Sequence, residues 1–213
     1  LFVSNHASYF DIPVLGSLIE VSFIAKSDMI DWPFFGTLAK LQRSVFVDRR
    51  PRNVGDHAND IAGRLADGDD LVLFAEGTTS DGNRLLPFKS ALFSVAEQAS
   101  PDRPLTIQPV SVVATAVDGM PLGRALRPVY SWFGDMPLLS HAWQAICLGR
   151  LRVEVEFQPA FAANGIARKA LAERCYTAVE QGFARAICGR AAATAPANRA
   201  PAVEDGEAIE AAA

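Results

Sequence analysis

The sequence is poor in the residues that build metal centres and disulfide frameworks. Its 213 residues include only three cysteines and three histidines. The cysteines are odd in number and widely spaced, which argues against a disulfide framework and fits a reducing cytoplasm. His6, His57 and His141 have no metal-ligand spacing, so the sequence indicates no metal site, and a lone His141 is expected to be structural.

Long apolar runs and a strong net charge are also missing. Half of the residues are hydrophobic and the mean hydropathy is +0.14. Even so, no run approaches the roughly 18 uninterrupted apolar residues of a membrane-spanning helix. The net charge is only −4, and we find no broad basic face with interleaved aromatics, which nucleic acid would require. We therefore expect no nucleic-acid partner.

The chain divides into a long patterned part and a short tail. We interpret residues 1–190 as one domain. Residues 191–213 are alanine-rich and acidic without apolar periodicity, so we expect a disordered tail. The chain starts at Leu1, without an initiator methionine and within an apolar run, so we read it as part of a longer protein whose membrane anchor precedes this segment.

Alternating strand and helix patterns predict an α/β fold. Apolar runs predict strands at 1–3, 21–25, 44–47, 71–75 and 106–117. Strict alternation of apolar and polar residues predicts a further strand at 151–157, either exposed or at an edge of the sheet. Helical patterns begin near residue 8 and cover 29–41, 53–66, 85–99 and 166–187. We predict a single α/β domain with a mixed, largely parallel central sheet flanked by helices.

His6 and Asp11 form the first chemical landmark. On one straight helix, five positions would turn them roughly 140° apart, at about 100° per residue. They meet only if His6 precedes a helix and Asp11 lies in its first turn. Ser8 is a good N-cap residue, and Asp11 follows it at the spacing of a capping box. An imidazole held by a carboxylate is a general base. The alternative is that Asp11 only caps the helix and His6 is a turn residue.

The loop after the apolar run 71–75 is the second landmark. Ligands of open α/β sheets collect at the carboxyl ends of strands. We expect Glu76 to accept hydrogen bonds from substrate hydroxyls, Gly77 to let the backbone come close, and Thr78 to line the same loop. Downstream, Lys89 would add a positive charge. The alternative is an ordinary turn.

Two further segments suggest contacts with anions and lipids. Several arginines lie close together in the sequence, at Arg43 and in the run Asp48-Arg49-Arg50-Pro51-Arg52. Their guanidinium groups suit the binding of a phosphate. The alternative is that they form a solvated charged surface. The aromatic segment 130–143 fits an acyl-chain groove, an interfacial membrane contact or core packing.

Taken together, four ordered blocks resemble those of the glycerolipid acyltransferases, the family of lysophosphatidate acyltransferases and their relatives. The family's N-H-x4-D block corresponds to Asn5-His6 and Asp11. Its later blocks are similar to Val45-Phe46-Val47-Asp48-Arg49, to Phe74-Ala75-Glu76-Gly77-Thr78-Thr79-Ser80 with Pro87-Phe88-Lys89, and to Ile107-Gln108-Pro109-Val110. The resemblance covers roughly residues 1–160.

The resemblance implies direct acyl transfer without a metal or cofactor. His6 would take the proton of an acceptor hydroxyl as it attacks the thioester of acyl-CoA or acyl-carrier protein, and Asp11 would hold the imidazole. The substrate-binding residues would be Arg49, Glu76, Gly77, Thr78 and Lys89. The acceptor would be a lysolipid, most simply 1-acyl-sn-glycerol-3-phosphate, at the cytoplasmic face of the inner membrane.

Two departures from the family pattern leave the acceptor open. Ala75 replaces a proline, and Thr79 replaces an arginine that contacts phosphate in many relatives. Arg49, Arg50, Arg84 or Lys89 would have to compensate, or the acceptor is lyso-ornithine lipid instead. Two other classes of protein are alternatives to an acyltransferase. One is a serine hydrolase, although this sequence has no G-x-S-x-G elbow, and the other is a non-catalytic lipid-binding module.

Overall fold

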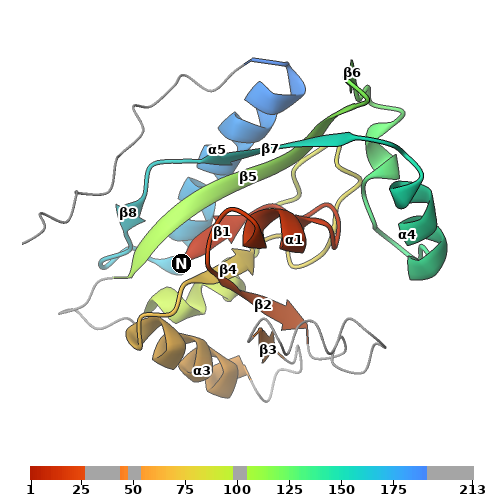
Figure 1. Ribbon diagram of the computed structural model, residues 1–213. Coiled ribbons are helices and arrows are strands. Elements are labelled where there is room, and N and C mark those ends of the chain that lie inside the picture. Colours follow the sequence, from red (N-terminus) through yellow and green to blue (C-terminus); the bar gives the residue numbers. More distant parts are fainter. Residues whose placement is uncertain (27–43, 48–53, 98–104, 191–213) are drawn as a thin grey trace, which may run out of the picture.

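The computed structural model describes residues 1–26, 44–47, 54–97 and 105–190, and these form an eight-stranded sheet flanked by helices (Figure 1). The strands are β1 (Phe2–Ser4), β2 (Ser22–Lys26), β3 (Val45–Val47), β4 (Leu71–Phe74), β5 (Thr106–Val117), β6 (Met120–Pro121), β7 (Leu151–Phe157) and β8 (Phe161–Ala162). The order β3-β2-β4-β1-β5 is parallel throughout, whereas β6, β7 and β8 each pair with β5 antiparallel.

The pairing of β1 with β4 places two sequence landmarks at one edge of the sheet. The strands are parallel, and Ser4 at the end of β1 lies opposite Phe74 at the end of β4. The segments that follow, beginning at Asn5 and at Ala75, therefore leave the sheet side by side. This is the edge at which open α/β sheets bind ligands.

Successive side chains of a strand point to opposite faces of the sheet, so each face has its own set of side chains. Different helices cover the two faces. The helical elements are α1 (Asp11–Gly16), α3 (Val54–Ala66), the 3₁₀ helices η2 (Ser90–Glu97) and η3 (Arg127–Val129), α4 (Leu138–Ile146) and α5 (Arg168–Ile187). None of the described helices has both the length and the apolar character needed to cross a membrane.

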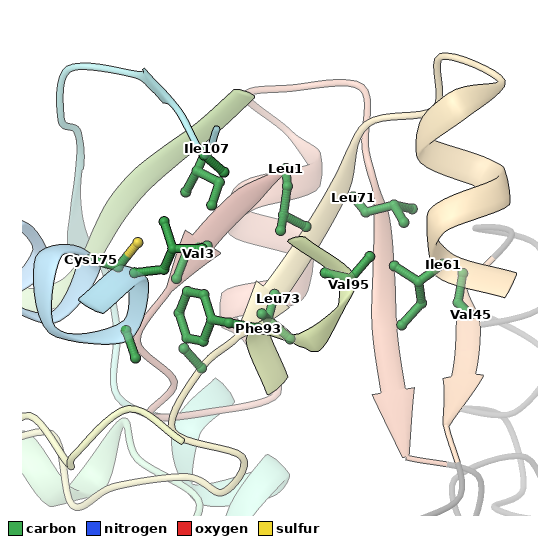
Figure 2. Close-up of a cluster of buried hydrophobic side chains, with 14 residues drawn as sticks. Leu1, Val3, Val45, Ile61, Leu71, Leu73, Phe93, Val95, Ile107 and Cys175 are labelled. Atoms are coloured by element: carbon green, nitrogen blue, oxygen red, sulfur yellow. The ribbon is translucent and has the colours of Figure 1, made fainter. Parts of the chain in front are cut away.

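The larger core lies between the sheet and α3, η2 and α5. Figure 2 shows Leu71 and Leu73 of β4 meeting Ile61 of α3 and Phe93 of η2. On the opposite face, Leu15 of α1 packs on a second buried cluster, formed by the alternate strand positions Phe23, Val72, Val110 and Val112. Burying these large side chains contributes about 1.5–3 kcal/mol each.

The predicted fold class is confirmed, and the predicted strands are found within one or two residues of their expected bounds. Strand β7 pairs only with β5 among the described strands, as an edge strand should. Helices were also expected in 29–41, and a tail in 191–213; both segments lie outside the described residues. The helices α4 and η3 had not been predicted.

Two helix predictions need correction. Of the predicted helix 85–99, the described residues 85–89 are not helical and Ser90–Glu97 form a 3₁₀ helix. The Lys89 N–H donates to the Ala75 carbonyl at 2.9 Å, so the preceding residues follow the sheet edge instead of a helix. Helix α1 begins at Asp11, with Phe10 as its N-cap and no side-chain cap, so Ser8 is not the N-cap that the sequence suggested.

Candidate active site

Asn5 fixes the point at which the chain leaves β1. Its side-chain Nδ2 donates to the Val112 carbonyl at 2.9 Å, and its Oδ1 accepts the Val112 N–H at 2.8 Å. The side-chain amide thus replaces a further strand residue beside β5, and both buried backbone groups of Val112 stay paired. The next residue, His6, therefore lies outside the strand.

The His6 imidazole and the Asp11 carboxylate are in contact. His6 Nδ1 lies 2.9 Å from Asp11 Oδ2, and the same oxygen accepts the backbone N–H groups of Ala7 at 2.8 Å and Ser8 at 3.0 Å. Asp11 is completely buried. Hydrogen bonds of this kind are what a buried carboxylate requires. The bond from Ser8 is the one that the capping-box spacing predicts, although the helix itself starts three residues later.

Tyr130 completes the surroundings of Asp11. Its hydroxyl donates to Asp11 Oδ1 at 2.7 Å, and the residue is 2% exposed. Burial and the neighbouring Asp11 carboxylate raise the pKa of the Tyr130 hydroxyl well above its ordinary value, so it remains a donor. Sequence reasoning did not identify this residue, because nothing in the local pattern links it to a turn more than one hundred positions away.

The second ring nitrogen of His6 is available for chemistry. The side chain is 18% exposed, and its ring stacks on Phe74 with 3.9 Å between centroids. Nε2 has no hydrogen-bond partner among the described residues. Because Asp11 is an acceptor for the proton on Nδ1, the neutral ring presents Nε2 as a base.

Glu76 connects the loop after β4 to the catalytic turn. Its Oε1 accepts the His6 N–H at 2.9 Å, its Oε2 accepts the Leu86 N–H at 3.1 Å, and the residue is 1% exposed. Burial raises the pKa of Glu76 from its ordinary value of 4.5 to about 8, and the two backbone bonds act in the opposite direction. In the structure both oxygens face backbone N–H groups in a buried position, and a contact with substrate hydroxyls stays a prediction.

A second bond from the same loop holds the other side of His6. The Ser80 N–H donates to the His6 carbonyl at 2.9 Å. Together with the bond to Glu76, it fixes the backbone of His6 through both its donor and its acceptor. His6 is therefore positioned by a loop about 70 residues further along the chain.

Gly77 and Lys89 lie together at this corner. Gly77 has a φ of +64°, and a Cβ built there would lie 3.1 Å from both Cδ and Nζ of Lys89. The glycine therefore allows both the turn and the close approach of the lysine stem. Lys89 and Thr78 are exposed. Arg49, the remaining predicted binding residue, and Arg50 lie outside the described residues.

A polar cavity of about 720 Å³ lies beside the following part of the loop. It is lined by Asp81, Asn83, Arg84, Arg124, Arg127 and Ile187. Arg127 is 7% exposed, and its guanidinium donates to Asn83 Oδ1 at 3.0 Å and to the Leu122 carbonyl at 2.8 Å. Burial lowers the pKa of Arg127, and Asp81 counteracts the shift. Arg84, named above as a substitute for the missing arginine, belongs to this basic group.

The site defines a class of protein: an α/β enzyme in which a buried carboxylate, itself bonded to a buried tyrosine, holds a partly exposed histidine at the carboxyl edge of the sheet. Within the described ranges, no group of three or more histidine, cysteine, aspartate or glutamate residues is arranged to hold a metal ion.

Comparison with known proteins gives the family. A family model described as Acyltransferase matches residues 1–113. The chain is 48% identical over 195 residues to a lyso-ornithine lipid O-acyltransferase of Brucella abortus, covering 89% of this chain and 73% of that protein. It is 49% identical to one from Rhizobium meliloti, covering 74% of this chain and 55% of the relative. The chain belongs to the acyltransferase family.

More distant relatives agree with this assignment. A 1-acyl-sn-glycerol-3-phosphate acyltransferase of Neisseria gonorrhoeae is 31% identical, over 74% of this chain and 58% of its own length. The crystal structure of PlsC from Thermotoga maritima, a 1-acyl-sn-glycerophosphate acyltransferase, matches with a TM-score of 0.57 at 22% identity, covering 86% of this chain and 64% of that one. The likeness to PlsC shows that the two proteins share a fold.

Proposed function

We propose that the protein transfers a fatty acyl group from a thioester donor, acyl-CoA or acyl-carrier protein, to the free hydroxyl of a lysolipid. One observation supports this most directly. His6 is bound through Nδ1 to the buried Asp11, while its Nε2 has no partner among the residues described. This is the arrangement of a general base that acts on a hydroxyl.

In this mechanism the acceptor hydroxyl lies within about 3 Å of His6 Nε2. The imidazole takes the hydroxyl proton while the oxygen forms a bond to the thioester carbonyl carbon. The carbon–sulfur bond then breaks, and the imidazolium returns the proton to the departing thiolate. Asp11 stabilises the imidazolium between the two steps. Such proton transfer contributes about 10²–10⁴-fold to the rate.

The other residues of the site have supporting roles in this proposal. Glu76 is a positioning residue, because it is buried and bonded to the backbone of His6. Lys89 provides an exposed positive charge beside Gly77 and is assigned to an anionic group of a substrate. Thr78 and Arg49 remain predicted substrate contacts.

Lyso-ornithine lipid is the acceptor that we favour. The two relatives at 48% and 49% identity carry that name, whereas the relative named for 1-acyl-sn-glycerol-3-phosphate is only 31% identical. Thr79 also stands where an arginine would contact a phosphate. The sequence pointed first to 1-acyl-sn-glycerol-3-phosphate, which is now the second candidate. Both acceptors are membrane lipids, so we place the reaction at the inner membrane, on the cytoplasmic face where thioester donors are available.

A direct assay tests the proposal. The purified full-length protein is incubated with a labelled donor, either acyl-CoA or acyl-carrier protein, and with lyso-ornithine lipid or 1-acyl-sn-glycerol-3-phosphate. We expect a labelled diacyl product, formed fastest from lyso-ornithine lipid, and none from a His6→Ala variant with unchanged circular dichroism. Absence of product from every pairing, or full activity of His6→Ala, would refute the proposal.

A further inference from the structure

Helix α4 presents large apolar side chains to solvent. Leu139 is 83% exposed, Trp143 is 70% exposed and Ile146 is 71% exposed. They occupy positions i, i+4 and i+7, which lie on one side of a helix. On the other side, His141 and Ala145 are buried. The exposed side of α4 is thus an apolar stripe instead of the polar face of an ordinary surface helix.

No charged residue interrupts this stripe. The helix reads Leu-Leu-Ser-His-Ala-Trp-Gln-Ala-Ile, without Asp, Glu, Lys or Arg, and its one histidine, His141, is on the buried side. Exposed apolar groups scattered singly are common, but a contiguous set of large ones marks an interaction surface. Tryptophan among leucine and isoleucine is the composition found at the boundary between lipid and water.

The buried side of α4 contacts the catalytic turn. The Tyr9 hydroxyl lies 3.0 Å from His141 Nδ1, and His141 Nε2 lies 3.2 Å from the Val129 carbonyl. Because Nε2 must donate to a carbonyl, Nδ1 accepts the tyrosine hydroxyl. Tyr9 lies between His6 and Asp11 in the chain, so the buried side of α4 contacts the turn that carries both residues.

A second contact and a groove extend this connection. The backbone N–H of Trp132 donates to the Ala7 carbonyl at 2.9 Å. A mainly apolar groove of about 360 Å³ runs beside α4, lined by Pro128, Val129, Met136, Pro137, Ser140, His141 and Gln144. In Figure 1, α4 lies toward the end of the sheet to which β2 and β4 point, the end that holds the site.

We infer that α4 is an interfacial helix that inserts Leu139, Trp143 and Ile146 into the surface of a lipid bilayer. The inference rests on the proposed function, because a lysolipid acceptor must reach His6 from a membrane. An uncharged stripe predicts binding to zwitterionic as well as anionic lipid, with little dependence on salt.

A second copy of the chain is a less suitable occupant of this surface. Three exposed side chains on one side of a helix form a small surface. A stable protein interface buries about 800 Å² on each partner. The stripe is also a single short helix of nine residues, whereas a bilayer imposes no minimum area.

Vesicle flotation of the chain of residues 1–213, without the membrane anchor expected to precede it, tests the inference. The triple variant Leu139→Ser, Trp143→Ser, Ile146→Ser is compared with wild type and with a matched control, Ser140→Ala and Gln144→Ala, on phosphatidylcholine vesicles with and without phosphatidylglycerol. We expect at least a tenfold loss of vesicle partitioning in the triple variant and none in the control. The substituted side chains are exposed, so the fold should persist.

Quenching by brominated lipid locates the contact. We expect wild-type fluorescence to be quenched on brominated vesicles and most of that quenching to be absent in Trp143→Phe, which should still bind. Equal quenching in the two proteins, or equal flotation of triple variant and wild type, would overturn the inference. So would a dimer in lipid-free buffer that the triple variant dissociates.

The readouts separate this inference from the proposed function. Flotation and quenching require no turnover, so an inactive protein that binds through α4 would refute only the proposed function. Conversely, an active enzyme whose binding to vesicles is unchanged by the three substitutions would refute only the interfacial helix. In an active enzyme, we expect the triple variant to lose about tenfold in rate on vesicle-borne lysolipid and to keep its rate on a short-chain, water-soluble acceptor.

Discussion

Tyr130 donates a hydrogen bond of 2.7 Å to Asp11, across 119 positions of sequence. With the bonds from His6, Ala7 and Ser8, the carboxylate accepts four hydrogen bonds on its two oxygens. Among the residues described, Tyr130 is the only hydrogen-bond donor to Asp11 Oδ1. Tyr130 therefore contacts Asp11 without contacting His6, so its influence on the proposed base can be tested separately.

Replacing Tyr130 with phenylalanine should weaken the base without removing it. We expect kcat to fall about tenfold with KM unchanged, because one oxygen of a buried carboxylate loses its donor, a cost of about 1–3 kcal/mol. Steady-state kinetics and thermal unfolding of the same variant separate the loss of rate from a loss of stability. An unchanged kcat would mean that the tyrosine is only a packing residue.

The exchange of Asp11 for asparagine should be far more damaging. An amide of the same shape cannot stabilise an imidazolium and favours the wrong tautomer, so we expect kcat to fall about 10²–10⁴-fold. Asparagine is preferable to alanine here, because it retains an oxygen for the N–H groups of Ala7 and Ser8. Steady-state kinetics together with thermal unfolding separate lost chemistry from lost folding.

The ionisation of Glu76 should make stability depend on pH. Its pKa is raised from 4.5 to about 8 in the folded protein. Between these values the native state binds more protons than the unfolded state, so the contribution of Glu76 is largest at low pH and declines as pH rises toward 8. We expect the free energy of unfolding, measured with denaturant, to fall over this range.

The matched variant is Glu76→Gln. It should be less stable than wild type at pH 5, because an amide offers only one oxygen to the N–H groups of His6 and Leu86. Its stability should also vary less between pH 5 and 8. A slope equal to that of wild type would show that another group is responsible for the pH dependence.

Alanine at Gly77 should disturb the corner that holds Lys89. The positive φ costs roughly 1–2 kcal/mol for a residue with a Cβ, and the new methyl group would press on the lysine stem at 3.1 Å. We expect reduced stability and a raised KM for the anionic substrate. As control, Gly63→Ala in α3 meets no atom within 4 Å and should stabilise the protein by about 0.8–1 kcal/mol. Both effects can be read from denaturant unfolding and substrate titration.

Features that depend on nearby residues could be predicted from the sequence. The apolar runs predicted the central strands, because a strand that is buried on both faces of a sheet needs apolar side chains at successive positions. The contact between His6 and Asp11 followed from a spacing that only a turn before a helix can satisfy. The start of that helix was misplaced, because the carboxylate of Asp11 binds the N–H groups of Ala7 and Ser8 in a turn that precedes α1.

Contacts between distant segments could not be read in this way. Tyr130 reaches Asp11, and His141 reaches Tyr9, only after β5 and η3 have returned the chain to the site. Glu76 stood out in the sequence as a group for binding substrate, yet its partners are backbone N–H groups that no pattern reveals. The stripe on α4 was suggested by the aromatic segment, but its exposure needed the structure.

The fixed backbone of His6 has a consequence for selectivity. Its peptide groups are bonded to Glu76 and Ser80, and its ring rests between Asp11 and Phe74, so the imidazole has little freedom to follow a misplaced hydroxyl. Alignment must then come from the lipid. In the proposed mechanism, a lysolipid is acylated at the hydroxyl whose distance from the head group brings its oxygen to His6 Nε2, so the position of acylation should depend on that distance.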